Sequence, residues 1–468
     1  METIKNQKLK IKNPRYVYFE TFGCQMNERD SEIMAALLGR IDYIPTPDME
    51  RADLVLLNTC SIRDKAEQKV YSLLGRLRQL KKTKKELIIT VAGCVAQQEG
   101  GRLLERMEHV DIVIGTRNLH RLPELVERVL QKLGPQVAIA LPRTFEIPSL
   151  AGPSCPPSPS PDAVPPIFKK FVTIMQGCNN FCTYCVVPHT RGREASRDRD
   201  EIIAEVAALV RSGVKEITLL GQNVNSYGLD RGGAPQFPAL LRAVAAVEGL
   251  ERLRFTTSNP KDLSEDLMRC FAELKVLCPH FHLPVQSGSD PVLARMNRKY
   301  TVATYLARVE GLRRFRPDIA LTTDIIVGFP GESEEDFEAT MELLGKVRFH
   351  GAFSFKYSDR PGTRSASFGG KVDEEEKSRR LARLQARQNE ITLERNREYT
   401  GQRLTVLVEG ESRNGKGQWQ GRTAFNLVVN FPSPPLRPGD SVEVVIEEGC
   451  RNSLRGRLAQ GKTIGMAE

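Results

Sequence analysis

The sequence predicts an α/β protein in three parts: an N-terminal parallel α/β domain, a central partial (β/α)6 barrel and a small C-terminal antiparallel β-barrel. Three observations carry this prediction. Short β-rich runs alternate with amphipathic segments along most of the chain, which is typical of βαβ units. The run Gly152–Pro166, nearly half proline, interrupts this alternation. After Gln402 the pattern changes to short alternating strands joined by Gly, Asn and Pro turns.

Length and composition fit several domains without a membrane segment. A chain of 468 residues exceeds one hydrophobic core, and 40% hydrophobic with 27% charged residues is ordinary for a soluble protein. No apolar run approaches the roughly 18 residues that a membrane span needs, and Met1–Tyr16 lacks the apolar stretch of a signal peptide. We therefore expect a cytoplasmic protein with no membrane partner. The net charge of +10 suits a polyanionic partner such as RNA, although many soluble proteins are basic.

The N-terminal domain is predicted from β-rich runs that are each followed by an amphipathic segment and a cysteine. These runs are Tyr16–Phe22, Asp53–Asn58 and Glu86–Ala92. Cys24, Cys60 and Cys94 close them, 36 and 34 residues apart. Because parallel sheets gather ligand-binding residues at the carboxyl ends of their strands, we expect the three cysteines to converge. The alternative is three separate, buried and inert thiols.

The proline-rich run Gly152–Pro166 is interpreted as an extended linker, and we do not expect Cys155 inside it to be a ligand. It sets the predicted boundaries: an N-terminal domain at 1–151, the linker at 152–166, the central barrel with a trailing helix at 167–398, and the C-terminal barrel at 399–468.

Six further β-rich runs with helical segments between them predict the partial (β/α) barrel, with its chemistry at the carboxyl ends of the strands. The runs are Phe171–Gln176, Glu216–Leu220, Arg252–Thr257, His280–Val285, Leu321–Val327 and Phe353–Tyr357. Among the helices we predict Asp200–Ser212 and Pro291–Phe315. One long amphipathic helix, Lys371–Glu398, follows the last strand, and its arginines face either RNA or solvent.

A cysteine motif follows the first of these strands. Cys178, Cys182 and Cys185 form a CxxxCxxC pattern, which places three thiolates within eight residues. A structural zinc site would want four ligands, whereas three ligands suit a [4Fe–4S] cluster that leaves one iron open. Ten cysteines in the whole chain are too few for a disulfide scaffold. The alternative is a set of reduced core cysteines.

The segment after Gln402 holds five short strands, which suit a small OB-like barrel. Such barrels bind single-stranded or looped RNA through groove charge and aromatic stacking. Trp419, Phe425 and Phe431 either stack on bases or fill the barrel core.

Over nearly its whole length the chain resembles the methylthiotransferase family of radical S-adenosylmethionine (SAM) enzymes. The stretches that carry the resemblance include TFGCQMNERDSE, NTCSIRDKAEQKVYSLLG, AGCVAQQEG, MQGCNNFCTYCVVPHTRGREASR, GQNVNSYG, HLPVQSGSD and DIIVGFPGESEEDF. The first block, GCQMN, resembles the branch that modifies isopentenylated adenosine in tRNA. The ribosomal-protein branch typically carries GCPKN there, and the threonylcarbamoyl-adenosine branch GCKVN. The long Gly152–Pro166 segment departs from the family pattern and puts domain spacing in doubt.

The resemblance implies a radical SAM barrel, a TRAM-like C-terminal barrel and two [4Fe–4S] clusters. It makes Cys178, Cys182 and Cys185 ligands of the SAM-cleaving cluster, and Cys24, Cys60 and Cys94 ligands of an auxiliary cluster. It places SAM against the aromatic residue of the cysteine motif, the end of the second barrel strand, the Asp324–Gly328 segment and one arginine. These residues are Tyr184, Gly221, Gln222, Asn223, Ile326, Gly328 and Arg197. Asp324–Gly328 resembles a degenerate GxIxGxxE element with Glu332 one place late, and Arg197 is equally suited to a structural ion pair.

The resemblance further implies the reaction: methylthiolation of C2 of N6-isopentenyladenosine at position 37 of tRNA, with two SAM molecules consumed. One SAM supplies a 5′-deoxyadenosyl radical, and the other methylates a sulfur on the auxiliary cluster. The implied partners are the tRNA anticodon arm, SAM, an electron donor such as flavodoxin or ferredoxin, and a sulfur donor, and we expect a monomer. The alternatives are a methylthiotransferase for threonylcarbamoyl-adenosine or for a ribosomal-protein aspartate, and a non-catalytic iron–sulfur RNA-binding protein.

Overall fold

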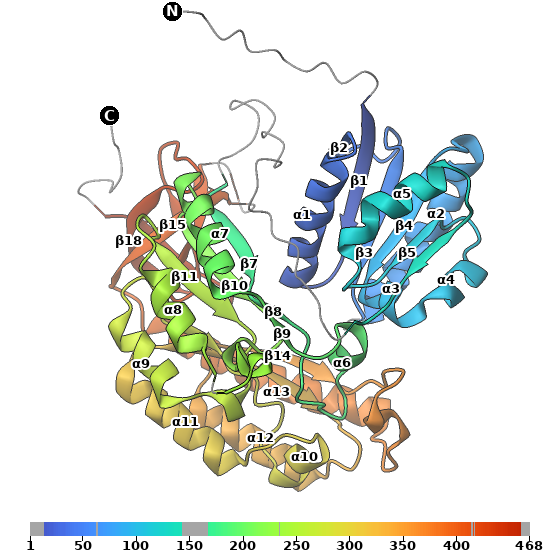
Figure 1. Ribbon diagram of the computed structural model, residues 1–468. Coiled ribbons are helices and arrows are strands. Elements are labelled where there is room, and N and C mark those ends of the chain that lie inside the picture. Colours follow the sequence, from blue (N-terminus) through green and yellow to red (C-terminus); the bar gives the residue numbers. More distant parts are fainter. Residues whose placement is uncertain are drawn as a thin grey trace, which may run out of the picture. The chain divides into compact units, whose positions relative to one another are not determined.

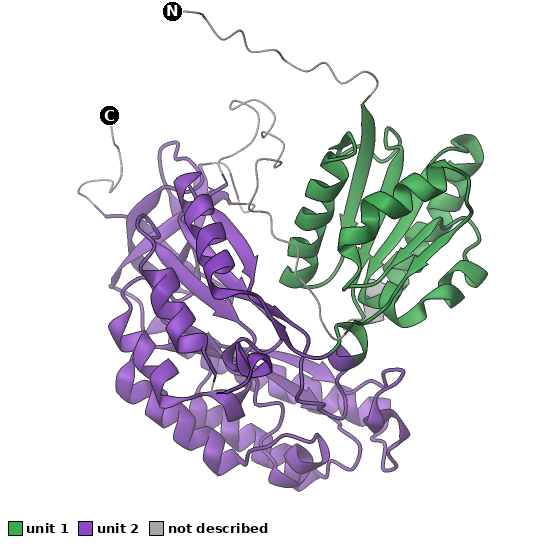
Figure 2. Ribbon diagram, viewed as in Figure 1, with its two compact units in different colours: residues 1–158, 189–192 green, residues 159–188, 193–468 purple. Residues whose placement is uncertain are grey.

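The computed structural model describes residues 14–61, 64–142, 167–233, 235–412, 415 and 417–459. The chain forms two compact units, shown in green and purple in Figure 2. Unit 1 holds residues 1–158 and 189–192, and unit 2 holds residues 159–188 and 193–468. The predicted linker at 152–166 lies outside the described residues, and the predicted domain boundaries stay a prediction. The inclusion of 189–192 in unit 1 was not predicted.

Unit 1 is built on a six-stranded parallel sheet in the order β2-β1-β3-β4-β5-β6 (Figure 1). Its strands are β1 Arg15–Thr21, β2 Tyr43–Pro45, β3 Leu54–Thr59, β4 Ile88–Gly93, β5 Ile112–Ile114 and β6 Gln136–Ala138. Every residue of β3 and β4 is buried, as expected for parallel strands that are covered on both faces. The predicted parallel α/β domain is confirmed. Strands β2, β5 and β6 were missed because three-residue strands carry almost no periodicity.

Helices cover both faces of this sheet. They are α1 Gln25–Gly39, α2 Asp64–Thr83, α3 Cys94–Glu99, α4 Gly101–Arg106 and α5 Leu122–Leu130, with the short η1 Leu119–Arg121 before α5. Leu54 and Leu56 of β3 pack with α1 and α5 in one core, whereas Val55 and Leu57 pack with α2, α3 and α4 in the other. The alternation of side chains along a strand thus divides one apolar run between two cores.

Unit 2 begins with six parallel strands in two hydrogen-bonded groups, β7-β10-β11 and β12-β13-β14, bridged in parallel between Leu253 and Leu277. The strands are β7 Lys169–Thr173, β10 Glu216–Leu220, β11 Arg252–Thr256, β12 His280–His282, β13 Ala320–Val327 and β14 Gly351–Lys356. The outer helices include α7 Arg199–Arg211, α8 Phe237–Ala245, α9 Glu265–Glu273, α11 Val302–Phe315, α12 Glu334–Val347 and α13 Glu374–Arg397 (Figure 1). A two-stranded antiparallel pair, β8 Met175–Gln176 with β9 Ala195–Ser196, flanks the first strand. The predicted partial (β/α)6 barrel is confirmed.

One predicted helix is wrong. Pro291–Phe315 is two helices, α10 Asp290–Arg295 and α11, because Asn297 takes a left-handed conformation with φ 59°. Thr301 then starts the second helix by accepting a hydrogen bond from the Thr304 amide at 3.2 Å. The predicted Lys371–Glu398 helix is present as α13, with Asp373 as its N-cap. Its arginines pair largely with glutamates of the same unit, which favours the solvent-facing alternative over RNA.

The C-terminal part of unit 2 is a closed barrel in the order β15-β16-β17-β19-β18. Its strands are β15 Arg403–Glu411, β16 Gln418–Thr423, β17 Val428–Pro432, β18 Ser441–Gly449 and β19 Leu454–Leu458. The predicted small OB-like barrel of five strands is confirmed, and its pairs are antiparallel except that β17 and β19 pair in parallel. A ring with an odd number of strands cannot alternate direction throughout, so closure forces one parallel pair. Trp419 and Phe431 are buried in its core with Phe425 packed against them, so the core interpretation of these aromatic residues is confirmed.

None of the helices in the described part of the chain is long and apolar enough to cross a membrane.

Candidate functional site

The order of the unit 1 sheet reverses at β1, whose neighbours are β2 on one side and β3 on the other. In doubly wound sheets, ligands bind at the carboxyl ends of the strands beside such a reversal. Cys24 follows β1, Cys60 follows β3, and Cys94 follows β4 and begins α3. All three predicted cysteines therefore lie at one edge of the sheet, at adjacent strand ends.

Two glycines show how closely the three strand ends approach one another. Gly23 has φ 109°, and a Cβ built on it would lie 2.3 Å from the Cys60 Cβ. Gly93 has φ 92°, and its Cβ would lie 2.4 Å from the Thr59 carbonyl oxygen. Each glycine precedes a cysteine, so only a residue without a side chain permits the contact that brings the cysteines together.

Side chains tie these turns to each other. The Asn27 amide donates to the carbonyl oxygens of Phe22, at 2.8 Å, and Thr59, at 2.9 Å. The Thr59 hydroxyl donates to the Ala92 carbonyl at 2.6 Å and accepts from the Val95 amide at 3.2 Å. The turns that carry the three cysteines are thus joined by one largely buried hydrogen-bond network. We call Cys24, Cys60 and Cys94 the first trio.

The segment 189–192 reaches the first trio from far along the chain. The Thr116 hydroxyl donates to the Thr190 carbonyl at 2.6 Å, and Arg117 Nε donates to the Arg191 carbonyl at 2.8 Å. Gly192 has φ 77°, and a Cβ on it would lie 2.8 Å from Arg117 Cζ. The segment is therefore docked through its backbone at the end of β5.

This docking buries the Arg191 side chain at 3% exposure. Its Nη2 donates to Asn27 Oδ1 at 2.9 Å and to Asp30 Oδ2 at 2.8 Å. Burial alone would lower the pKa of Arg191, but the charges of Asp30, Cys94 and Cys24 raise it, so the guanidinium stays charged. Burial raises the pKa of the Cys94 thiol, and Arg191 opposes that rise by favouring the thiolate. A fixed positive charge therefore lies beside the first trio.

Cys178, Cys182 and Cys185, the second trio, lie in the loop between β8 and α6 Val187–Thr190. Hydrogen bonds fix this loop at several points: the Gly177 amide donates to Gln222 Oε1 at 2.5 Å, and the Asn179 amide donates to Glu194 Oε1 at 3.1 Å. The Cys185 amide donates to the Cys182 carbonyl at 3.0 Å, which turns the chain back between the two cysteines.

Two donors point at the sulfurs of the second trio. Asn180 Nδ2 lies 3.3 Å from Cys178 Sγ, and Arg298 Nη1 lies 3.3 Å from Cys182 Sγ. Burial raises the pKa of Cys178 to about 11 and that of Cys185 to about 12, and the latter is raised further by Cys182. The thiols of Cys178 and Cys185 are therefore protonated at neutral pH, and metal binding would release their protons.

No three His, Cys, Asp or Glu side chains of the described residues are close enough to share a single metal ion. In a [4Fe–4S] cube each thiolate binds a different iron, so its ligands stand farther apart than the ligands of one ion. Each trio supplies three thiols, which is the ligand number of a cluster with one open iron and one fewer than a structural zinc site takes.

The predicted SAM contacts at the end of β10 are already in use by the protein. A Cβ on Gly221 would lie 2.5 Å from Met175 Cγ, so only glycine allows β8 to approach. Gln222 holds the Gly177 amide, next to Cys178. Asn223 accepts from the Asn259 amide at 3.0 Å and donates to Asp262 Oδ2 at 2.8 Å. The side chains of Gln222 and Asn223 are thus held by the protein itself, and the Asn223 carbonyl accepts from the Ser226 amide at 3.0 Å.

The predicted contacts at the end of β13 join the second trio through packing. Tyr184 lies edge-to-face on Phe329 with ring centroids 6.4 Å apart, and Ile326 packs in the same cluster. Gly328 has φ 69°. Glu332 accepts from the amides of Gly328, at 3.0 Å, and Phe329, at 3.3 Å, so the shifted glutamate still clamps this turn.

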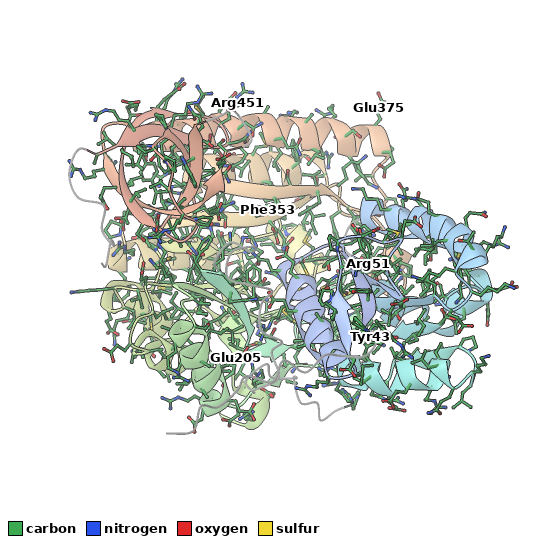
Figure 3. All side chains as sticks on the ribbon, turned by 90° about the horizontal axis from the view of Figure 1, so that it is seen from above. Tyr43, Arg51, Glu205, Phe353, Glu375 and Arg451 are labelled. Atoms are coloured by element: carbon green, nitrogen blue, oxygen red, sulfur yellow. The ribbon has the colours of Figure 1, made fainter. Side chains whose placement is uncertain are left out.

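Arg197 is buried, and its Nη1 donates to Glu205 Oε2 at 2.7 Å (Glu205 is labelled in Figure 3). The structural ion pair is thus present. Its Nε and Nη2 are buried and have no hydrogen-bond partner among the described residues. The predicted pairing with a SAM carboxylate stays a prediction, and these two nitrogens are the groups that would make it.

The inner face of the partial barrel carries two exposed aromatic rings. Phe353 pairs with Asp324 and Phe355 pairs with Ile326 across β13 and β14, on the face opposite to the buried core residue Ile325. Phe353 is 57% exposed and Phe355 is 41% exposed (Phe353 is labelled in Figure 3). His282 Nε2 lies 3.5 Å from Asp324 Oδ2, and its ring lies 6.0 Å from that of Phe353.

Sequence reasoning missed Arg191, Arg298 and Asn27. Arg191 and Arg298 reach the cysteine sites from positions that are distant in the sequence, and Asn27 acts through hydrogen bonds to the backbone of neighbouring strand ends. Cysteine spacing reveals none of these contacts. The sequence offered one clue: some of these residues lie inside or near a motif, as Arg191 does in the charged run after Cys185.

Comparisons with known proteins agree with this architecture. Residues 16–115 match a family described as Uncharacterized protein family UPF0004, residues 172–344 match the Radical SAM superfamily, and residues 397–459 match the TRAM domain. A solved structure of the radical SAM methyltransferase TsrM from Kitasatospora setae has a TM-score of 0.56 at 14% identity, covering 75% of each chain. At that identity the likeness concerns the fold alone.

Two relatives are called tRNA-2-methylthio-N(6)-dimethylallyladenosine synthase. The one from Desulfotalea psychrophila is 55% identical over 95% of this chain and 99% of its own length. The one from Geobacter sulfurreducens is 51% identical over 96% of this chain and 98% of its own length. The chain belongs to the tRNA-2-methylthio-N(6)-dimethylallyladenosine synthase family, a branch of the radical SAM methylthiotransferases.

Proposed function

We propose that this protein is a radical SAM enzyme that places a methylthio group on C2 of N6-dimethylallyladenosine at position 37 of tRNA. The observation that carries the proposal is the first trio: three cysteines at adjacent strand ends of unit 1, in addition to the second trio beside the partial barrel. A radical SAM enzyme that only cleaves SAM needs one such site. A transferase that also delivers sulfur has a use for two.

The residues divide into two groups in this proposal. Cys178, Cys182 and Cys185 would hold a [4Fe–4S] cluster that binds SAM, and Cys24, Cys60 and Cys94 would hold an auxiliary [4Fe–4S] cluster. When bound, these groups supply the electron, the radical and the sulfur that the reaction needs. Asn180 and Arg298 donate to sulfurs of the second trio and so stabilise the thiolate form that binds iron.

For SAM itself, we propose the contacts expected from the sequence: the backbone of Tyr184, the turn Gly221–Asn223, and Ile326 and Gly328 at the end of β13. The fit is supported by the Gln222 bond to Gly177, which links the β10 turn to the cysteine loop. Arg197 would use its unpartnered Nε and Nη2 for the SAM carboxylate while Glu205 holds its orientation.

For the nucleobase, we propose the inner face around Phe353 and Phe355. Two exposed rings give a flat apolar surface, which suits both the adenine and its dimethylallyl chain. The adjacent Asp324 and His282 could hydrogen-bond the base.

We propose the C-terminal barrel as the part that binds the tRNA anticodon arm, through charge and not through stacking, because Trp419 and Phe431 are buried. The electron donor, such as flavodoxin or ferredoxin, the sulfur donor, a monomeric state and action in the cytoplasm also belong to this proposal.

The test is anaerobic reconstitution of the wild type and of Cys178→Ala and Cys60→Ala, with 5′-deoxyadenosine and modified tRNA nucleosides measured by mass spectrometry. We expect Cys178→Ala to lose SAM cleavage. We expect Cys60→Ala to keep SAM cleavage and lose methylthio transfer. Cys450→Ala is the matched control, because Cys450 lies in the C-terminal barrel and outside both trios, and it should behave as the wild type. Full product from Cys60→Ala would remove the first trio from the mechanism.

The substrate is tested separately by supplying tRNA that carries dimethylallyladenosine, unmodified adenosine or threonylcarbamoyl-adenosine. We expect product only from the first. Product from threonylcarbamoyl-adenosine would favour the alternative branch of the family.

A further inference from the structure

The Arg191 guanidinium has one nitrogen that the protein does not use. Nη2 donates to Asn27 and Asp30, but Nη1 is buried and has no hydrogen-bond partner among the described residues. A buried donor without an acceptor costs about 1–3 kcal/mol, and more when it is charged. Native proteins rarely leave such a group unpaired, so an unpaired one indicates an acceptor that the polypeptide does not supply.

The charged groups around Arg191 indicate what kind of acceptor Nη1 would bind. Arg191 interacts electrostatically with both Cys24 and Cys94, so two ligands of the first trio lie near its charge. Asp30, whose carboxylate pairs with Nη2, also interacts with the charge of Arg29, so it does not need a second donor from Arg191. The guanidinium is close enough to Cys94 to hydrogen-bond it and favours negative charge on the sulfurs of Cys94 and Cys24, while Nη1 stays without a partner among the described residues. An acceptor for Nη1 that lies at the first trio would therefore be a sulfur that carries negative charge.

Docking of the segment 189–192 shows that this placement is specific. Two backbone carbonyls, of Thr190 and Arg191, are held by Thr116 and Arg117, and Gly192 allows the close approach. These contacts fix the chain on either side of the guanidinium, so its position does not depend on the bond to Asp30 alone.

We propose that Arg191 Nη1 donates a hydrogen bond to an anionic sulfur held at the first trio, either a sulfide of the cluster or a further sulfur on its open iron. This rests on the proposed function, because it requires a cluster at Cys24, Cys60 and Cys94. Hydrogen bonds to the sulfurs and nearby charge set the reduction potential of such clusters. Arg191 is therefore a positioning residue that stabilises the more negative, reduced state and the sulfur to be transferred.

The test uses the full chain with Cys178, Cys182 and Cys185 replaced by Ala, so that only the first trio can carry a cluster. Into this background we introduce Arg191→Gln, which removes the charge and replaces the guanidinium with a shorter neutral amide, and Arg191→Lys, which keeps the charge and the pairing with Asp30. Arg121→Gln is the matched control, since it removes one partly exposed positive charge from the same unit.

Two readouts are measured on the reduced cluster: its midpoint potential, and the electron–nuclear coupling of exchangeable deuterons after transfer to D2O. We expect Arg191→Gln to make reduction at least tenfold less favourable, which is about 59 mV for one electron. We expect Arg191→Lys to fold and to lose the deuteron coupling, and Arg121→Gln to change neither. A coupling that is present without added sulfide assigns the acceptor to the cluster, and one that requires added sulfide assigns it to a sulfur on the open iron.

An unchanged potential in Arg191→Gln, or an unchanged coupling in Arg191→Lys, would overturn the proposal while leaving the function intact. The failure of the proposed function gives a different result: the triple-alanine parent would then contain no cluster at all. Thermal unfolding of the metal-free variants, followed by circular dichroism, checks the structural contribution of Arg191 independently. We expect metal-free Arg191→Lys to unfold within a few degrees of its parent, and a collapse of this variant would overturn the proposal in favour of a purely structural role.

Discussion

Replacing Arg254 with Met should loosen the C-terminal barrel from the partial barrel. Arg254 lies on β11 and is buried, and its Nη1 and Nη2 donate to the carbonyl oxygens of Ala424, at 2.9 Å, and Thr423, at 2.8 Å. Its Nε lies 3.1 Å from Glu216 Oε2. One side chain thus links the β11 strand, its neighbour β10 and the C-terminal barrel.

The expected cost follows from these contacts. Hydrogen bonds with a charged donor contribute about 1.5–3 kcal/mol each, so the two carbonyl bonds together account for about 3–6 kcal/mol. Removing one partner from a buried ion pair costs about 3–5 kcal/mol, and it concerns the same charge, so the two estimates overlap and are not added. We expect the free energy of unfolding to fall by about 4 kcal/mol, a large fraction of the total stability of an ordinary domain.

The assay uses the only tryptophan of the chain, Trp419, which is buried in the C-terminal barrel. Its fluorescence during urea denaturation of the metal-free protein reports on that barrel. With an m value of about 1–3 kcal/mol per M, the midpoint should fall by at least about 1 M.

The control is Arg242→Met, because Arg242 is a partly exposed arginine that pairs with Asp266 and Glu273 on the outer helices. Exposed pairs contribute about 0–1 kcal/mol, so this midpoint should barely move. If Arg254→Met unfolded at the wild-type urea concentration, the C-terminal barrel would be an independently tethered domain, and the contacts of Arg254 would carry no energy. The double variant Arg254→Met with Glu216→Gln should recover part of the loss, since it removes the charge left unpaired.

Three further predictions concern the substrate, pH and tRNA. Phe353→Ala should raise KM for dimethylallylated tRNA by roughly tenfold or more and leave SAM cleavage without tRNA unchanged. Leu133→Ala is the control, because Leu133 is equally exposed at 57%, and it should change neither quantity. An unchanged KM in Phe353→Ala would show that this face does not bind the substrate. Burial lowers the pKa of His350 to about 3, so between pH 6.5 and 3 the unfolded chain binds a proton that the folded protein does not, and stability decreases as the pH is lowered through this range. Between pH 6.5 and pH 5 this proton uptake lowers the free energy of unfolding by up to about 2 kcal/mol. In urea denaturation, the free energy of unfolding of His350→Asn should therefore fall by that much less than that of the wild type over the same range. Equal losses in both proteins would refute the assignment. Reversing the exposed charges of Arg403 and Arg451 should weaken tRNA binding and flatten its salt dependence in titrations from low to high salt, and an unaltered Kd would exclude this surface.

Much of the fold was predictable because the alternation of a β-rich run with an amphipathic helix recurs along the chain. The runs that became β3 and β4 are continuously apolar and long enough to be recognised, and the cysteines that follow them could be placed together because carboxyl ends of parallel strands share one edge. The split of the predicted Pro291–Phe315 helix was less accessible, because it depends on the left-handed conformation of one residue, Asn297.

The chemistry around the cysteines was predictable only in part. Spacing identifies ligands within one loop, as for Cys178, Cys182 and Cys185, but it does not say which distant loop docks beside them. Arg191 is held through its backbone carbonyl by Arg117 and contacts Asn27, more than 160 positions earlier in the chain, and no local pattern marks such a contact. For the same reason the sequence placed Arg254 on a strand of the partial barrel but did not indicate that its side chain donates to the backbone of the C-terminal barrel.

The central claim is that each trio of cysteines holds its own [4Fe–4S] cluster. Iron and acid-labile sulfide per chain, measured after anaerobic reconstitution of the wild type and of the two triple-alanine variants, test it most directly. We expect about eight irons in the wild type and about four in each variant, whether the first or the second trio is replaced. A variant that kept the full wild-type iron content, or a replacement of one trio that emptied both sites, would contradict the assignment of two independent clusters.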